Sequence, residues 1–93
     1  MFKQYELFGG KVVAIDYSSA EGQSTIGVIS PGVYKFGTDA DERLTITSGE
    51  ISYRKYKGDD WVRYGTQSTF TVGDGEIFEL KAEVVSTFHL IRG

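Results

Sequence analysis

Short runs in which apolar and polar residues alternate constrain the fold of this chain more than any other feature. Within residues 43–47, Leu44 and Ile46 alternate with charged and threonine residues, and the run ends before a glycine. Strict alternation of this kind predicts a β-strand that buries one face and exposes the other. The same pattern recurs at residues 68–72 and 77–81. We therefore expect a protein built from short strands.

Nine such segments are predicted along the chain. They are residues 11–16, 24–29, 33–36, 43–47, 50–56, 61–64, 68–72, 77–81 and 84–91. Strands spaced about 8–12 residues apart, with no helical pattern between them, indicate an antiparallel sandwich or barrel. A double Greek key closed into a small barrel would leave few exposed strand edges. In the last segment, Val84, Phe88 and Leu90 are expected to share one face with Arg92, and His89 to face the other way.

Three turns are predicted between these strands. Pro31-Gly32 has the chemistry of a type II turn, because proline presets φ and glycine tolerates a positive φ. Residues 57–60 read as a hairpin turn, and Gly73-Asp74-Gly75 as another. The acidic loop 38–42 joins the strand 33–36 to the strand 43–47.

The length of 93 residues predicts a single domain, residues 1–93. A chain of this size buries roughly 60–65% of the surface that its unfolded form exposes. A second subunit would add burial, and an isologous homodimer is the commonest arrangement, so we expect a homodimer.

Charge and targeting features narrow the class of partner. The net charge of −3 argues against nucleic acid, and the run Arg54-Lys55-Tyr56-Lys57 reads as a solvated strand end. The absence of cysteine excludes disulfides and thiolate metal sites. Neither a signal-peptide pattern nor a long apolar run is present, so we expect a cytoplasmic protein that does not interact with membranes.

The spacing around the acidic loop resembles half of the first cupin motif. Glu42 is followed by six residues and Gly49, as in that motif, but Phe36 and Thr38 stand where its two histidines belong. Phe78 stands where the second motif has its histidine. The resemblance implies an all-β, single-domain cupin barrel of the jelly-roll or double-stranded β-helix type. It also implies no metal and no cofactor.

A narrower resemblance covers nearly the whole chain. It rests on spaced residues that include Tyr5-x-x-Phe8-x-Gly10-Lys11-Val12, Gly32-x-Tyr34-x-Phe36-x-Thr38, Glu42-x-x-Thr45-x-x-Ser48-Gly49, Asp60-Trp61-x-x-Tyr64 and Phe70-x-Val72-x-x-x-x-x-Phe78-x-Leu80. In these the chain resembles the small cupin family of pyrimidine/purine nucleoside phosphorylases, and it departs at Gly73 and Gly75. The resemblance implies that nucleosides and inorganic phosphate are the substrates. Phosphate would replace the base at C1′, giving ribose 1-phosphate and a free purine or pyrimidine, with a broad choice of base.

Glu42 and Thr38 are the candidate catalytic residues. The Glu42 carboxylate would bind ribose hydroxyls or stabilise an oxocarbenium-like centre. Its structural alternative is a carboxylate that caps turn amides or pairs with Arg43. The Thr38 hydroxyl can donate and accept, and its alternative is a hydroxyl that stabilises the loop.

The substrate and phosphate sites have several candidates. A wall of aromatic side chains would stack on any base, and its candidate members are Tyr34, Phe36, Tyr53, Trp61 and Phe78. For each of these residues, packing in the core is the structural alternative. Arg92 is the candidate phosphate ligand. Backbone amides at Ser48-Gly49 or at Gly73-Asp74-Gly75 are the alternative. His89 is either a general acid or a half-buried sheet residue.

Two other functions remain open at this point. A small cupin could bind a sugar, nucleoside or anion without converting it, using the same Glu42 and aromatic pocket. A metal-dependent oxygenase or isomerase would need several imidazole ligands, whereas His89 is the one histidine of the sequence.

Overall fold

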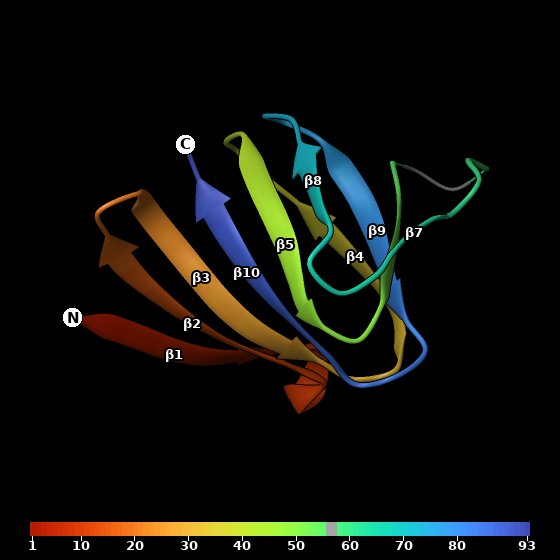
Figure 1. Ribbon diagram of the computed structural model, residues 1–93, viewed down its shortest axis with the longest axis horizontal. Helices are drawn as coiled ribbons and strands as arrows, with labels where there is room; N and C mark the ends of the chain where they lie inside the picture. Colours follow the sequence, from red (N-terminus) through yellow and green to blue (C-terminus); the bar gives the residue numbers. More distant parts are fainter. Residues whose placement is uncertain (56–57) are drawn as a thin grey trace.

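Two antiparallel sheets form the fold in the computed structural model, which describes residues 1–55 and 58–93 (Figure 1). Six strands form the first sheet in the order β1-β2-β3-β10-β5-β8, and four form the second in the order β4-β9-β6-β7. The strand bounds are β1 (Phe2–Leu7), β2 (Val12–Ser19), β3 (Gly22–Ile29), β4 (Gly32–Gly37), β5 (Glu42–Ser48), β6 (Ile51–Arg54), β7 (Val62–Tyr64), β8 (Thr69–Val72), β9 (Ile77–Ala82) and β10 (Ser86–Arg92). A 3₁₀ turn, Phe8–Gly10, links β1 to β2. The predicted all-β fold is confirmed.

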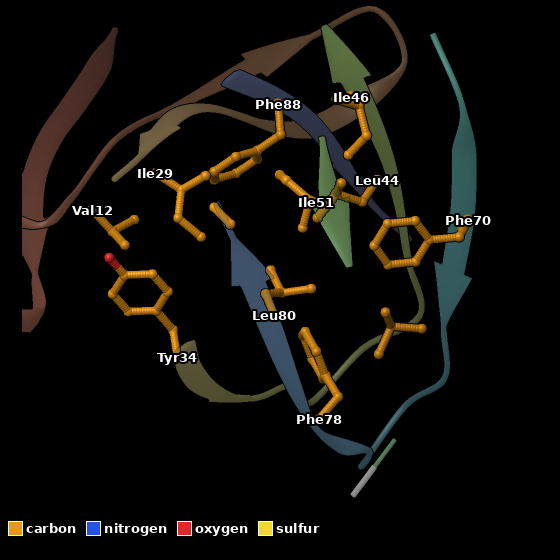
Figure 2. Close-up of a cluster of buried hydrophobic side chains, with 12 residues drawn as sticks. Val12, Ile29, Tyr34, Leu44, Ile46, Ile51, Phe70, Phe78, Leu80 and Phe88 are labelled. Atoms are coloured by element: carbon orange, nitrogen blue, oxygen red, sulfur yellow. The ribbon is translucent and has the colours of Figure 1, made fainter. Parts of the chain in front are cut away.

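The core lies between the two sheets. Strand β10 lies between β3 and β5, so the end of the chain joins both halves of the first sheet. Leu44 and Ile46 on β5 point inward, as their alternation predicts, and Thr45 and Thr47 lie on the outer face. Figure 2 shows how the inward side chains of both sheets meet, among them Ile29, Leu44, Ile46, Ile51, Phe70, Phe78, Leu80 and Phe88.

One strand was missed, and the last strand was predicted to begin too early. Strand β1 was not predicted at all, because it is an edge strand with mostly exposed side chains and therefore shows little apolar alternation. Its main chain pairs with β2 from Phe2↔Tyr17 to Leu7↔Val12. Val84 was expected in the last strand, but β10 begins at Ser86 and the Val84 side chain is 52% exposed.

The predicted turn at residues 73–75 is confirmed, because Gly75 has a φ of 79° and the Glu76 amide donates to the Gly73 carbonyl at 3.1 Å. At Pro31 the chain bends, but the predicted type II turn is wrong: Gly32 has a φ of 152°, far from the value of about +80° in that turn, and begins β4. The predicted strand 50–56 ends at Arg54. Tyr56, in that strand, and Lys57, in the predicted hairpin turn, lie outside the described residues.

Gly49 is the backbone position where a side chain is least tolerable. Its φ is +84°, and a Cβ there would lie 2.3 Å from Ser86 Oγ and 3.0 Å from Ser86 Cα. Ser86 cannot easily give way, because it is fully buried and its hydroxyl accepts from the Glu50 amide at 3.0 Å.

We therefore expect Gly49→Ala to lower the free energy of unfolding by about 2–4 kcal/mol, from backbone strain and overpacking together. Urea unfolding would measure the change. Gly65→Ala is the matched control, because a Cβ at Gly65 would meet no atom within 4 Å. Equal losses in the two variants would contradict this reading of Gly49.

Candidate functional site

A cleft of about 740 Å³ opens at one end of the first sheet. It lies where β5 begins and where β8 and β10 end, beside the C-terminus marked in Figure 1. The strand register sets Glu42 opposite both Arg92 and Val72 at this end. The cleft is lined by Glu21, Gly22, Asp41, Glu42, Arg43, Thr71, Val72, Gly73, Ile91, Arg92 and Gly93.

Glu42 and Arg92 form an ion pair in the cleft. The Nε of Arg92 donates to Oε2 of Glu42 at 3.2 Å. The Glu42 side chain is 10% exposed and the Arg92 side chain 38% exposed, so the carboxylate lies beneath a guanidinium that reaches solvent. Arg92 faces inward as its parity predicts, and Glu42 points into the end of the barrel as the motif resemblance implies. Arg43, the alternative partner of Glu42, is exposed.

The Thr38 hydroxyl is engaged within its own loop. It donates to the Ala40 carbonyl at 2.8 Å and accepts from the Ala40 amide at 3.2 Å. The Thr38 main chain bonds to Glu76 and Gly75 in the turn between β8 and β9. Thr38 therefore joins two loops at the cleft end of the barrel, which is the structural role considered for it.

The glycine turn is not available as a phosphate site. Its first amide, that of Gly73, donates to the Glu76 carboxylate at 3.0 Å, and the Asp74 amide donates to the Asp41 carboxylate at 2.8 Å. The Gly75 amide donates to the Thr38 carbonyl at 2.9 Å. All three donors are thus taken up by the chain itself. The other amide pair considered, at Ser48-Gly49, lies at the opposite end of β5 from Glu42.

Three of the five candidate aromatic residues come together inside the barrel. The Phe78 ring lies 5.8 Å from the rings of both Phe36 and Tyr53, centroid to centroid. Phe78 is buried, whereas Phe36 and Tyr53 are half-buried. The Tyr53 hydroxyl donates to the Glu76 carboxylate, the same side chain that holds the glycine turn.

The other two aromatic residues are not brought to this group. The buried Tyr34 donates its hydroxyl to the Ser30 carbonyl at 2.7 Å, beyond the end of β3, and so acts in the core. Trp61 carries two cations over its ring, with the Arg54 guanidinium carbon at 4.3 Å and the Lys81 ammonium at 4.7 Å. These two cations alternate with inward side chains on β6 and β9, so Trp61 lies on the outer face of the second sheet.

A polar group that sequence reasoning missed lies on the inner face of β1, β2 and β3. Asp16 Oδ1 accepts from the Tyr5 hydroxyl at 2.9 Å and from the Thr25 hydroxyl at 2.7 Å. Burial raises the pKa of Tyr5, and the hydrogen bond and charge of Asp16 act in the same direction. Arg92 opposes this shift and Glu42 adds to it, so both cleft residues act electrostatically on the phenol. The sequence did contain a sign of this group, because the alternation that places Val12 and Ala14 inward also places Asp16 inward.

His89 lies outside the cleft. It alternates with the inward Phe88 and Leu90, and its Nε2 lies 3.2 Å from the Tyr17 hydroxyl. This is the half-buried sheet residue considered from the sequence. Within residues 1–55 and 58–93, no three histidine, cysteine or carboxylate side chains gather as a metal site. The same residues contain no helix with the length and apolarity needed to cross a membrane.

Comparison with known proteins places this geometry in a family. Residues 2–89 match the sequence model of the family described as pyrimidine/purine nucleoside phosphorylase. A protein of that name from Vibrio cholerae is 35% identical over 95% of this chain and 93% of its own length. Another from Pseudomonas syringae pv. tomato is 41% identical over 95% of both chains.

Solved structures agree with the fold. A protein of unknown function from Vibrio parahaemolyticus superimposes with a TM-score of 0.92 at 28% identity, covering 97% of this chain and 96% of that one. A cupin superfamily protein from Desulfitobacterium hafniense gives a TM-score of 0.72 at 12% identity, covering 95% and 83%. The fold is thus that of a cupin, and the chain belongs to the pyrimidine/purine nucleoside phosphorylase family.

Proposed function

We propose that this protein is a phosphorylase that cleaves nucleosides with inorganic phosphate. A phosphate oxygen forms a bond to C1′ as the bond from C1′ to the base nitrogen breaks. The base leaves with the electron pair of that bond and takes up a proton, and ribose 1-phosphate is the second product. Membership of the family named for this activity carries the proposal. The inward ion pair of Glu42 and Arg92 in the cleft supports it.

Arg92 is the proposed phosphate ligand. A guanidinium has five N–H donors, and its fork matches the oxygens of a phosphate. The Nε–H of Arg92 binds Glu42, which fixes the orientation of the guanidinium plane. Its remaining N–H groups can turn to an anion, because the side chain is 38% exposed at the cleft. Carboxylates at Glu21, Asp41 and Glu42 also line the cleft, so an anion binds there only where a cation faces it directly.

Glu42 is proposed to stabilise the positive charge that develops on the sugar. Cleavage of an N-glycosidic bond builds charge at C1′, and a preorganised carboxylate beside that carbon favours the transition state over the bound substrate. The pairing with Arg92 holds the carboxylate in one orientation before substrate arrives. Within one ion pair, Glu42 would therefore act on the sugar and Arg92 on the phosphate.

The base is proposed to pack against the half-buried rings of Phe36 and Tyr53, which lie against Phe78. Stacking tolerates any base, because every base has a π-face. A site of this kind supports the cleavage of both purine and pyrimidine nucleosides. Phe36, Thr38 and Phe78 occupy the positions of the cupin metal ligands and offer no imidazole, which supports a mechanism without a metal.

The test is release of free base from the purified protein. We expect uracil from uridine, adenine from adenosine and guanine from guanosine, in each case only when phosphate is present and to the same extent after treatment with EDTA. Chromatography of the products measures both the base and ribose 1-phosphate. Failure to release base from any nucleoside would overturn the proposal, and loss of activity in EDTA would overturn its metal-free part. Calorimetric binding of uridine without turnover would favour the non-catalytic binding protein instead.

A further inference from the structure

Asp16 is an unusual residue for its position in the fold. The preceding inward positions of β2 hold Val12 and Ala14, which are buried in the core. A carboxylate at the next inward position must be hydrogen-bonded, because its desolvation is costly. Tyr5 and Thr25 supply two bonds, and both end on Oδ1. No described residue donates to Oδ2, so that oxygen can accept from a ligand.

A hollow of about 260 Å³ lies beside this carboxylate. Asp16 lines it together with Lys3, Ser18 and Gln23, which adds an ammonium and a Ser18 hydroxyl that accepts from the Gln23 amide at 3.2 Å. Such a set of donors and acceptors suits a ligand with several hydroxyl groups. Gln23 pairs with Arg92 across the strands β3 and β10, so the hollow adjoins the cleft that contains the ion pair.

We propose that Asp16 binds the 2′-hydroxyl of the nucleoside ribose through Oδ2, and so makes the site prefer ribonucleosides to 2′-deoxyribonucleosides. This inference rests on the proposed phosphorylase function and names the sugar that the same site takes. Tyr5 and Thr25 act as positioning residues, because their hydroxyls hold Oδ1 and thereby aim Oδ2. Burial and the neighbouring Asp16, which raise the pKa of Tyr5, favour the protonated phenol that donates to Oδ1.

The size of the preference follows from hydrogen bonding to a charged acceptor. A site built around a substrate hydroxyl rejects an analogue that lacks the hydroxyl, because its polar group is left unpaired. One hydrogen bond to a carboxylate corresponds to a factor of about 10–100 in an equilibrium or a rate. We expect kcat/KM for uridine to exceed that for 2′-deoxyuridine by about that factor.

Asp16→Asn is the test variant. Asparagine keeps the shape and still offers an oxygen to Tyr5 and Thr25, but it places an uncharged NH2 where Oδ2 was. We expect its kcat/KM for uridine to fall about 10-fold or more and that for 2′-deoxyuridine to change less than about 3-fold. Thr45→Val is the control, because it removes a hydroxyl pair with Thr69 on the opposite face of the same sheet. It should leave the ratio of the two substrates unchanged.

An equal loss on both substrates in Asp16→Asn would overturn the inference, since a purely structural role does not distinguish a 2′-hydroxyl from hydrogen. A wild-type protein with no preference would overturn it as well. If the wild type cleaves no nucleoside, the proposed function fails, and calorimetry with methyl β-D-ribofuranoside and its 2-deoxy counterpart then decides the sugar site. Binding of the riboside alone, lost in Asp16→Asn, would support the site. Absence of binding by either sugar would overturn it.

Discussion

Replacing Arg92 with methionine is expected to lower kcat/KM for phosphate by about 100- to 1000-fold, the loss typical when one preorganised charge-stabilising donor is removed. Methionine fills similar space but has no N–H groups for the attacking phosphate. The variant also removes the charge that faces the anion in a cleft lined by Glu21, Asp41 and Glu42. Initial rates of base release at varied phosphate and fixed uridine would measure the loss.

Two further variants make this test specific. Arg43→Met removes a cation that lines the same cleft but lies at an outward position of β5. Because solvent screens a surface charge, kcat/KM for phosphate should change by no more than about 3-fold in this variant. Arg92→Lys restores the charge without the planar fork and should recover part of the activity. Equal losses in Arg43→Met and Arg92→Met would show that phosphate responds to the general field of the cleft and would contradict direct binding by Arg92.

The sequence predicts the fold well where one face of a strand is buried and the other is not. Leu44 and Ile46 show this alternation, and their strand was placed correctly. Strand β1 was missed because hydrogen bonds to the neighbouring strand, and not apolar burial, hold it in the sheet. The homodimer and the cytoplasmic location stay predictions.

Strand parity and motif spacing predicted some residues of the candidate site, and the others could not be predicted from either. Glu42 and Arg92 are fifty positions apart, yet the motif resemblance placed Glu42 at the barrel mouth and the parity of Arg92 placed it at the barrel end. Spacing could not show that Trp61 lies on the outer face. Trp61 was expected to begin the strand 61–64, but β7 begins at Val62, so strand parity does not fix the direction of the Trp61 side chain. The contacts of Asp16 with Tyr5 and Thr25 join three strands, one of them unpredicted, so no local pattern contains them.

Glu42→Gln is expected to lower kcat by about 100- to 1000-fold while KM for the nucleoside stays within about 3-fold. Glutamine has the shape of glutamate and still offers an oxygen to Arg92 Nε, so the geometry of the cleft is kept. What is lost is the negative charge beside C1′, which attracts the sugar strongly only once positive charge has developed there. Opposite unit charges about 4 Å apart attract by about 4 kcal/mol at an effective dielectric constant near 20, enough for a loss of this size.

Measuring kcat and KM separately distinguishes the two roles considered for Glu42, which are stabilising charge on C1′ and binding the ribose hydroxyls. A carboxylate that merely binds ribose hydroxyls holds substrate and transition state equally, so its loss would raise KM and leave kcat nearly unchanged. Glu21→Gln is the matched control, because Glu21 lines the same cleft from the exposed turn between β2 and β3. If Glu42→Gln raised KM alone, Glu42 would bind the sugar equally in the substrate and in the transition state. The positive charge that develops on C1′ would then have to be stabilised by the attacking phosphate, which Arg92 holds.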